Sequence, residues 1–144
     1  MASNLSEPGR LQILHVDDDL LNLRVVEDIM CAFGHVAFGV SCGQAALEQL
    51  GQRTFDLVLM DIHMPGMSGI EVVQRLRASV GPERLTPVIA LTADCHSRTR
   101  ADYLKLGFQD YVTKPILVSQ LCDAILKAVG RAVPAAEQLS LRFG

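Results

Sequence analysis

Short apolar runs alternate along this chain with segments of helical periodicity, and this alternation restricts the fold more than any other feature. The runs predict strands at 11–16, 35–40, 55–60, 87–91 and 109–112. The segments that follow them repeat apolar residues at three- and four-residue steps, which predicts helices. Strands that alternate with helices form a parallel sheet covered on both faces. We therefore predict an α/β fold of five strands and five helices.

Local signals mark the ends of the predicted helices. Capping-box patterns at 41–44 and 68–71 begin two helices, and Gly34 and Gly107 end two others. The remaining helix at the C-terminal end is predicted at 116–129, and the polar helix before Gly107 at 96–106. We predict a leader at 1–9, one domain at 10–131 and a tail at 132–144.

Composition excludes several classes of protein. The 144 residues are 49% apolar and 20% charged, which is typical of a globular domain. A net charge of −3 without a dense Lys/Arg stripe argues against direct nucleic-acid binding. No apolar run has the roughly 20 residues that a membrane helix needs, and no secretion signal is present. The four cysteines form no CxxC pair, so we predict reduced thiols packed as small apolar groups in a cytoplasmic protein.

Polar residues follow the predicted strands at the point where each strand ends. Asp17, Asp18 and Asp19 follow the first run, Asp61 ends the third, Thr92 the fourth, and Lys114 follows the fifth. In an open parallel sheet the carboxyl ends of the strands share one edge, where ligands bind. We therefore expect acids, a hydroxyl and an amine to converge on one site.

This group of acids needs a cation or protons to offset its repulsion. Two carboxylates a few ångströms apart repel each other by about 4 kcal/mol at an effective dielectric of 20. Mg²⁺ suits oxygen donors of this kind, and we expect Asp19 to cap the helix that follows. A carboxylate beside Mg²⁺ can accept a phosphoryl group, with Lys114 and Thr92 placed to stabilise the transferred oxygens.

The motifs resemble the receiver domain of two-component response regulators, in the style of hybrid histidine kinase and phosphorelay receivers. The resemblance covers roughly residues 11–129 and rests on the segments 13–19, 56–69, 89–93 and 110–115. It implies a flavodoxin-like doubly wound sheet with strand order 2-1-3-4-5. A histidine kinase or histidine phosphotransfer protein would be the donor, and a downstream protein the partner.

The resemblance also assigns a role to each site residue. It implies that Asp61 is the phosphoacceptor, and that the carboxylates of Asp17, Asp18 and Asp61 and the backbone carbonyl of His63 hold Mg²⁺. Lys114 would contact the phosphoryl group, and a cis peptide bond can join it to Pro115.

The remaining roles concern the response to phosphorylation. Thr92 would be the switch hydroxyl and Tyr111 the switch aromatic. His63 and Asp94, two residues beyond the acceptor and the threonine, would modulate dephosphorylation. His15 stands where the family mostly carries an aliphatic residue; we expect a hydrogen-bonded core histidine, with tuning of the acidic pocket as the alternative.

Other interpretations of the function remain open. A degenerate receiver would act as a binding module without accepting phosphate, and a haloacid-dehalogenase-like phosphatase would use the Asp-x-Asp within 17–19 but leaves Asp61 unexplained. A receiver is not an enzyme with turnover, although a parent chain could be a hybrid histidine kinase. About 15 residues after Val129 are too few for an output module. We therefore expect a stand-alone receiver or one cut from a larger kinase, and Met1 slightly favours a complete product.

Overall fold

A five-stranded parallel sheet forms the centre of the protein, as the computed structural model of residues 10–94 and 96–130 shows. The strands are β1 (Gln12–Val16), β2 (Val36–Val40), β3 (Leu57–Asp61), β4 (Val88–Thr92) and β5 (Asp110–Thr113). Their order is β2-β1-β3-β4-β5, so the predicted flavodoxin-like sheet is confirmed. The predicted leader at 1–9 and tail at 132–144 lie outside the described residues.

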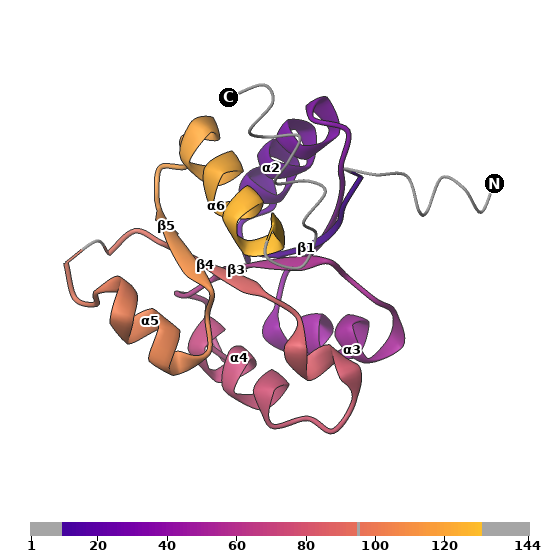
Figure 1. Ribbon diagram of the computed structural model, residues 1–144, viewed down its shortest axis with the longest axis vertical. Coiled ribbons are helices and arrows are strands. Elements are labelled where there is room, and N and C mark those ends of the chain that lie inside the picture. Colours follow the sequence, from indigo (N-terminus) through magenta and orange to yellow (C-terminus); the bar gives the residue numbers. More distant parts are fainter. Residues whose placement is uncertain (1–9, 95, 131–144) are drawn as a thin grey trace.

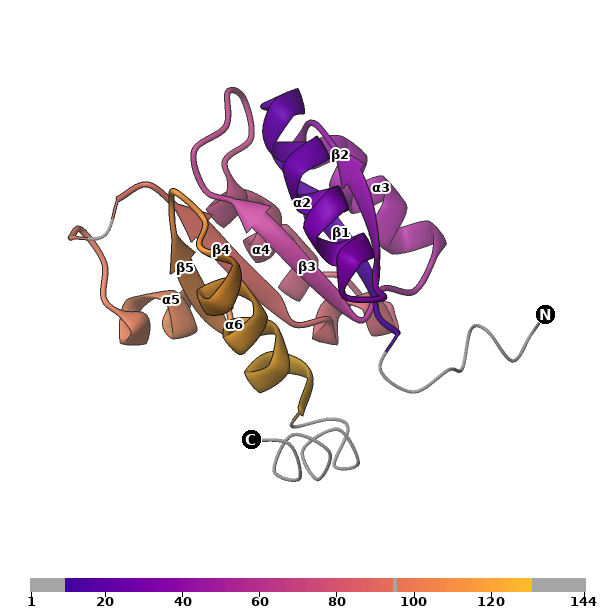
Figure 2. The ribbon, with the colours of Figure 1, turned by 90° about the horizontal axis from the view of Figure 1, so that it is seen from above.

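Helices cover both faces of the sheet (Figures 1 and 2). One face carries α2 (Leu20–Ala32) and α6 (Val118–Gly130), and the other carries α3 (Gly43–Gln52), α4 (Gly69–Arg77) and α5 (Arg100–Leu106). A short 3₁₀ helix, Pro82–Leu85, precedes β4. Among the residues that the structure describes, no helix is long and apolar enough to cross a membrane.

Alternation along the central strand β3 divides the core into two layers. Leu57 and Leu59 pack on the α2 and α6 side, whereas Val58 and Met60 pack on the side of α3, α4 and α5. All of these side chains are buried, and each such burial stabilises the fold by roughly 1.5–3 kcal/mol. A strand buried on both faces reads as a continuous apolar run, which is why β3 was visible in the sequence.

Two predicted helix starts are confirmed. The Asp19 carboxylate accepts hydrogen bonds from the backbone N–H groups of Leu21 (2.9 Å) and Asn22 (3.4 Å) at the start of α2. Ser68 Oγ accepts from the N–H of Glu71 at 3.2 Å at the start of α4. Both are side-chain caps of the kind that stabilise a helix by about 1 kcal/mol.

At two other helices the prediction is wrong, for the cap of one and for the first residue of the other. The capping box at 41–44 does not form, because Cys42 is the N-cap of α3 and makes no side-chain cap bond. Gly43, the first residue of α3, packs closely against α4, since a Cβ there would meet Val72 Cγ2 at 2.6 Å. The helix predicted from residue 96 begins at Arg100, where Thr99 and Asp102 form a capping box.

Smaller differences concern the last helix and the thiols. Helix α6 begins at Val118 rather than at the predicted residue 116. The peptide bond between Lys114 and Pro115 is cis, as the sequence suggested. Cys31 and Cys42 are exposed, so the prediction that the cysteines pack as small apolar groups is wrong for these two.

Candidate functional site

The predicted site residues lie at the carboxyl ends of parallel strands. Asp17 follows β1, Asp61 is the last residue of β3, Thr92 ends β4, and Lys114 follows β5. Strand β1 pairs with β2 on one side and β3 on the other, so chain connections leave it in opposite directions. This is the topological switch point of an open α/β sheet, where ligand sites form.

Three carboxylates form one cluster at this point. Asp17, Asp18 and Asp61 each offer an oxygen, and these oxygens lie within 4.8 Å of one another. Asp17 and Asp61 are buried, whereas Asp18 is exposed. Asp17 is further held by the Asp19 N–H, which donates to its Oδ1 at 2.9 Å, and by Asn22 Nδ2, which donates to its Oδ2 at 3.3 Å.

The ammonium of Lys114 joins the cluster. Its Nζ lies 3.2 Å from Asp17 Oδ2 and 3.4 Å from Asp61 Oδ1. One cation thus contacts two buried acids, which offsets part of their mutual repulsion. The predicted convergence of the acids with the amine is therefore present in the folded chain.

The surroundings of Asp61 together make its carboxyl group harder to ionise. Burial raises the pKa of Asp61 above its ordinary value, the Lys114 ammonium lowers it, and the Asp17 carboxylate raises it again. A second cation beside the cluster would favour the ionised form in the same way as Lys114.

The loop after β3 contacts Asp61 from the other side. The N–H of His63 donates to Asp61 Oδ1 at 3.3 Å, and the His63 side chain is exposed. Gly69 packs directly against the carbonyl oxygen of Asp61, leaving no space for a Cβ. The sequence marked this glycine only as part of a capping pattern, because a tertiary contact of this kind leaves no local signal.

Thr92 is buried and already hydrogen-bonded within its own loop. Its Oγ1 accepts from the N–H of Asp94 at 3.0 Å and donates to the carbonyl of Asp94 at 3.4 Å. The Asp94 carboxylate accepts from the N–H groups of His96 and Ser97, each at 3.0 Å. Hydrogen bonds from the Ser97 side chain and then from these two amides lower the pKa of Asp94 to about 2.

Tyr111 sits half-buried against the helix that follows this loop. Its ring stacks on the buried ring of Tyr103 in α5, with centroids 5.0 Å apart and an interplanar angle of 21°. The two rings connect β5 to α5, so a movement of Tyr111 requires this stack to break or to move with it.

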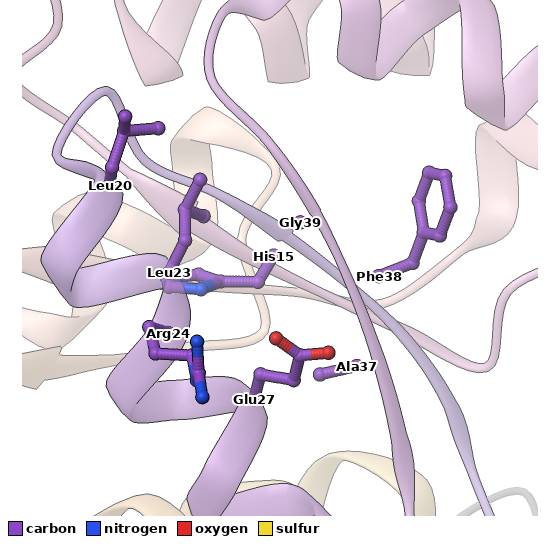
Figure 3. A pocket seen from close by; sticks show the side chains of 8 residues that line it. All are labelled: His15, Leu20, Leu23, Arg24, Glu27, Ala37, Phe38 and Gly39. Atoms are coloured by element: carbon purple, nitrogen blue, oxygen red, sulfur yellow. The ribbon is translucent and has the colours of Figure 1, made fainter.

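His15 differs from its expected environment. It is buried as predicted, with its ring directed toward α2 (Figure 3), but neither ring nitrogen has a hydrogen-bond partner within the part of the chain that the structure describes. The prediction of a hydrogen-bonded core histidine is therefore wrong. Its Nε2 lies 4.0 Å from Asp17 Oδ2, and burial lowers the pKa of His15 to about 4, so the ring is neutral at neutral pH.

The donor set fits Mg²⁺. Asp17, Asp18 and Asp61 each offer carboxylate oxygen, which is a ligand that Mg²⁺ prefers, and the exposure of Asp18 leaves room for the waters that this ion retains. Asn22, which the sequence did not single out, supports this set by fixing Asp17 from the first turn of α2.

A comparison with protein families agrees with this geometry. The model of the response regulator receiver domain matches residues 13–126. The chain belongs to this family. The receiver-domain resemblance predicted from the motifs is thereby confirmed.

Similar sequences come from much longer sensor proteins. The chain is 37% identical over 131 residues to the sensor protein GacS of Pseudomonas syringae pv. syringae, covering 88% of this chain and 14% of GacS. It is 34% identical over 117 residues to the aerobic respiration control sensor protein ArcB of Escherichia coli, covering 81% of this chain and 15% of ArcB. The chain is thus related to the receiver domains of hybrid sensor kinases and spans a small part of their length.

Solved receiver domains share the fold. The receiver domain of sensor histidine kinase PA1611 from Pseudomonas aeruginosa has a TM-score of 0.76 and 29% identity, covering 84% of this chain and 98% of that one. That structure holds a magnesium ion in its active site cleft. The Francisella response regulator 1452 receiver domain has a TM-score of 0.77 and 26% identity, covering 85% and 99% of the two chains.

Proposed function

We propose that this receiver domain, which we place at residues 10–131, accepts a phosphoryl group on Asp61 from a phosphohistidine donor and signals through a conformational change to a protein partner. One observation carries the proposal. Asp61 is a buried carboxylate at the end of β3, with the Lys114 ammonium 3.4 Å from its Oδ1 and two further carboxylates within 4.8 Å. An acid and an amine in this arrangement suit in-line phosphoryl transfer.

The transfer forms one bond and breaks another. A carboxylate oxygen of Asp61 attacks the phosphorus atom as the bond from phosphorus to the donor's imidazole nitrogen breaks. The donor imidazole leaves with the electron pair and takes up a proton. The Lys114 ammonium stabilises the charge that spreads over the phosphoryl oxygens, and the His63 N–H, 3.3 Å from Asp61 Oδ1, orients the acceptor.

The acid cluster would hold Mg²⁺ during this step. We assign its protein ligands to the carboxylates of Asp17, Asp18 and Asp61 and to the backbone carbonyl of His63. When bound, the ion would neutralise charge on the carboxylates and on the transferred phosphoryl group. The Asn22 and Asp19 contacts to Asp17 keep that carboxylate aimed at the site.

A donor protein has an apolar surface to bind beside the site. Leu20 and Leu21, directly after the acidic residues, are 73% and 70% exposed, and Leu117, three residues after Lys114, is 54% exposed. A histidine carried on a histidine kinase or phosphotransfer protein must come within bonding distance of Asp61, so the donor has to cover this rim. We expect these leucines to be buried in that complex.

Phosphorylation would then act through Thr92 and Tyr111. To reach a phosphoryl oxygen, the Thr92 hydroxyl must give up its hydrogen bonds to the backbone of Asp94. Movement of Thr92 opens space beside β5, and Tyr111 turns inward, which alters its stack on Tyr103 and moves α5. Backbone NMR shifts with a phosphoryl mimic test this switch, and unchanged shifts around Thr92, Tyr111 and α5 would refute it.

His63 and Asp94 are proposed to set the lifetime of the phosphoryl group. Both lie on loops that follow strands of the site, at β3 and β4. We expect His63→Ala and Asp94→Ala to change the rate of autodephosphorylation without preventing phosphorylation. Asp94→Ala also removes the bonds to the His96 and Ser97 amides, so Asp94→Asn, which keeps an acceptor oxygen, is its matched control. Equal rates in His63→Ala and the parent would contradict the role of His63.

Intact-protein mass after incubation with acetyl phosphate and Mg²⁺ tests the central proposal. We expect one phosphoryl adduct on the parent chain, and none with EDTA or in Asp61→Asn. Asp28→Asn is the matched control, because Asp28 is 70% exposed on α2 and its carboxylate pairs with Arg24 rather than with a residue of the site; this variant should keep the adduct.

The other outcomes separate the alternatives. A folded parent chain without an adduct under any condition would favour a degenerate receiver that binds partners without accepting phosphate. Continuous release of phosphate from a phosphate ester, with many turnovers per chain, would indicate a phosphatase. An adduct that persists in Asp61→Asn would show that another residue is the acceptor.

A further inference from the structure

Arg77, the last residue of α4, donates hydrogen bonds to backbone carbonyls outside its own helix. Its Nε and Nη2 donate to the carbonyl of Gly107 at 3.0 and 2.7 Å. Its Nη1 donates to the carbonyls of Arg84 and Thr86 at 2.8 and 2.6 Å. One side chain thus connects the end of α4 to the end of α5 and to the segment before β4. The proposed phosphorylation chemistry uses none of these residues.

The half-buried guanidinium of Arg77 lies at the negative ends of two helices. Arg77 belongs to the last turn of α4, and Gly107 caps the C-terminal end of α5. A helix carries partial negative charge at this end, on carbonyls that have no partner within the helix. A cation between two such ends is therefore stabilised. The planar fork of an arginine also presents several N–H donors at once, which the ammonium of a lysine cannot do in the same geometry.

The C-terminal end of α5 is packed closely against α4. Gly107 has a φ of 106°, and a Cβ there would meet Val73 Cγ1 at 3.1 Å and Arg77 Cγ at 3.2 Å. The next residue, Phe108, is buried, and its N–H donates to the carbonyl of Tyr103 at 3.0 Å. The rings of Tyr103 and Phe108 meet edge to face, with centroids 5.7 Å apart. Tertiary contacts therefore fix this end of the helix.

The N-terminal end of α5 is held by weaker contacts. Thr99 and Asp102 form its capping box, which is a contact within the helix itself. Arg100 Nε pairs with Asp110 Oδ1 at 3.2 Å, but the Arg100 side chain is 50% exposed, and exposed ion pairs stabilise a fold only weakly. This end of α5 also follows the loop that begins at Thr92, the proposed switch residue.

We infer that Arg77 is a positioning residue of the proposed switch, which anchors the C-terminal end of α5 so that the helix turns about Gly107. Movement that begins at Thr92 and Tyr111 displaces the N-terminal end of α5, while the hydrogen bonds from Arg77 to the Gly107 carbonyl are kept. The surface that changes on phosphorylation is then the part of α5 and its preceding loop at 96–103. This inference rests on the proposed function, because the movement is the proposed response to phosphorylation.

A shift of the whole helix is the alternative, and it would cost more. Arg77 would have to give up its bonds to the Gly107 carbonyl, and polar groups left unpaired away from water are costly. The close packing of Gly107 against α4 would also be lost. A turn about Gly107 keeps these contacts. Because Arg100 and Leu106 are about 9 Å apart along the helix axis at 1.5 Å per residue, such a turn still moves the first turn of α5.

Amide hydrogen exchange of the full chain, without Mg²⁺ or a phosphodonor, tests the anchor. Arg77→Gln should speed exchange at Gly107 and Phe108 about tenfold, the size expected from loss of a charged hydrogen bond. Arg75→Gln makes the same change on the exposed face of α4, where Arg75 pairs with Glu71 at 3.0 Å, and should exchange like the parent. Unchanged exchange at Gly107 and Phe108 in Arg77→Gln would overturn the inference.

Amide chemical shifts on addition of beryllofluoride and Mg²⁺, which mimic the phosphoryl group, test the turn about Gly107. In the parent we expect changes at 96–103 that are several-fold larger than those at 104–109. In Arg77→Gln the changes should extend to 104–109, because that end of α5 is no longer fixed. A loss of stability alone would not alter this distribution. The same distribution in both proteins, or parent changes as large at 104–109 as at 96–103, would overturn the inference.

The same spectra separate this inference from the proposed function. Shifts around Asp61 without any shift in α5 would overturn the inference, although Asp61 accepts the mimic. No shift around Asp61 would refute the proposed phosphorylation instead, and amide exchange would then decide whether Arg77 anchors α5. If Arg77→Gln does not fold, Arg77→Lys, which keeps the charge but cannot bridge the carbonyls, is expected to loosen the same end of α5 and decides both tests.

Discussion

The ammonium of Lys114 lies 3.2 Å from Oδ2 of Asp17, a contact between residues 97 positions apart in the chain. Asp17 is 1% exposed and Lys114 is 22% exposed, so the pair is only partly screened by water. The contact ties the end of β5 to the end of β1 across two intervening strands. Lys114 therefore has a structural role in the unphosphorylated protein in addition to the proposed role in phosphoryl transfer.

Lys114→Met is expected to lower the free energy of unfolding by about 1–2 kcal/mol at pH 7 without Mg²⁺, because it leaves the buried Asp17 without its cation. Addition of Mg²⁺ should recover part of this loss. Urea denaturation with and without Mg²⁺ measures both effects. Lys127→Met, at an exposed position of α6, is the matched control and should have little effect. Equal stability of the Lys114 and Lys127 variants would contradict the prediction.

Asp61→Asn is expected to stabilise the metal-free protein at pH 7. Burial and the Asp17 carboxylate raise the pKa of Asp61 in spite of Lys114, so its ionised form is disfavoured in the folded state. Removal of this charge should increase the free energy of unfolding by about 1–2 kcal/mol, allowing for the offset by Lys114.

The advantage of Asp61→Asn should depend on pH in one direction. The folded parent binds this proton more tightly than the unfolded chain, so its stability falls as pH rises from the ordinary value of 3.8 through the raised pKa. The difference between variant and parent should thus be largest at neutral pH and shrink on acidification. A difference that grows as the pH falls would show that the sign is wrong.

His15 makes the stability of the folded protein depend on pH with the opposite sign. Its pKa is lowered from 6.5 to about 4 by burial, with the Asp17 carboxylate opposing this and Lys114 adding to it. The unfolded chain binds a proton that the folded chain resists, so the parent loses stability as pH falls from 6.5 toward 4. The loss is on the order of 3 kcal/mol at ~1.4 kcal/mol per pKa unit.

His15→Leu should remove this contribution to acid sensitivity, because it leaves no titratable group at the position. Urea midpoints of parent and variant measured from pH 7 to pH 4 test the prediction. Parallel curves over that range would show that His15 does not carry the effect. The parent and His15→Leu contain the same acids. The difference between their two curves therefore cancels the contributions of those acids to the pH dependence.

Gly69→Ala is expected to destabilise the protein by about 2 kcal/mol or more. A Cβ at this position would meet the carbonyl oxygen of Asp61 and, at 2.9 Å, the Cγ of Met60, so the acceptor strand or α4 must move. Gly51→Ala, in α3, has open space around the new Cβ and should stabilise by roughly 0.5–1 kcal/mol. Thermal unfolding of both variants measures the contrast, and similar effects at the two glycines would refute it.

Several features of the fold could be read from the chain because they depend on local pattern. The apolar run of β3 and the caps at Asp19 and Ser68 were visible in neighbouring residues, since burial on both faces and a side-chain cap each have a short sequence signature. The capping box predicted at 41–44 does not form, and the close packing of Gly43 against α4 is a tertiary contact that no local pattern records.

The candidate site shows the same division between features that follow from local sequence and features that depend on tertiary contacts. The sequence alone placed acids, a hydroxyl and an amine at the ends of strands, and the carboxyl ends of parallel strands share one edge of the sheet. Only the tertiary structure placed Lys114 between Asp17 and Asp61, fixed Asp17 through Asn22, and left His15 without a hydrogen-bond partner among the described residues. These contacts join residues on different strands and helices, so their distances depend on tertiary packing rather than on any periodicity in the chain.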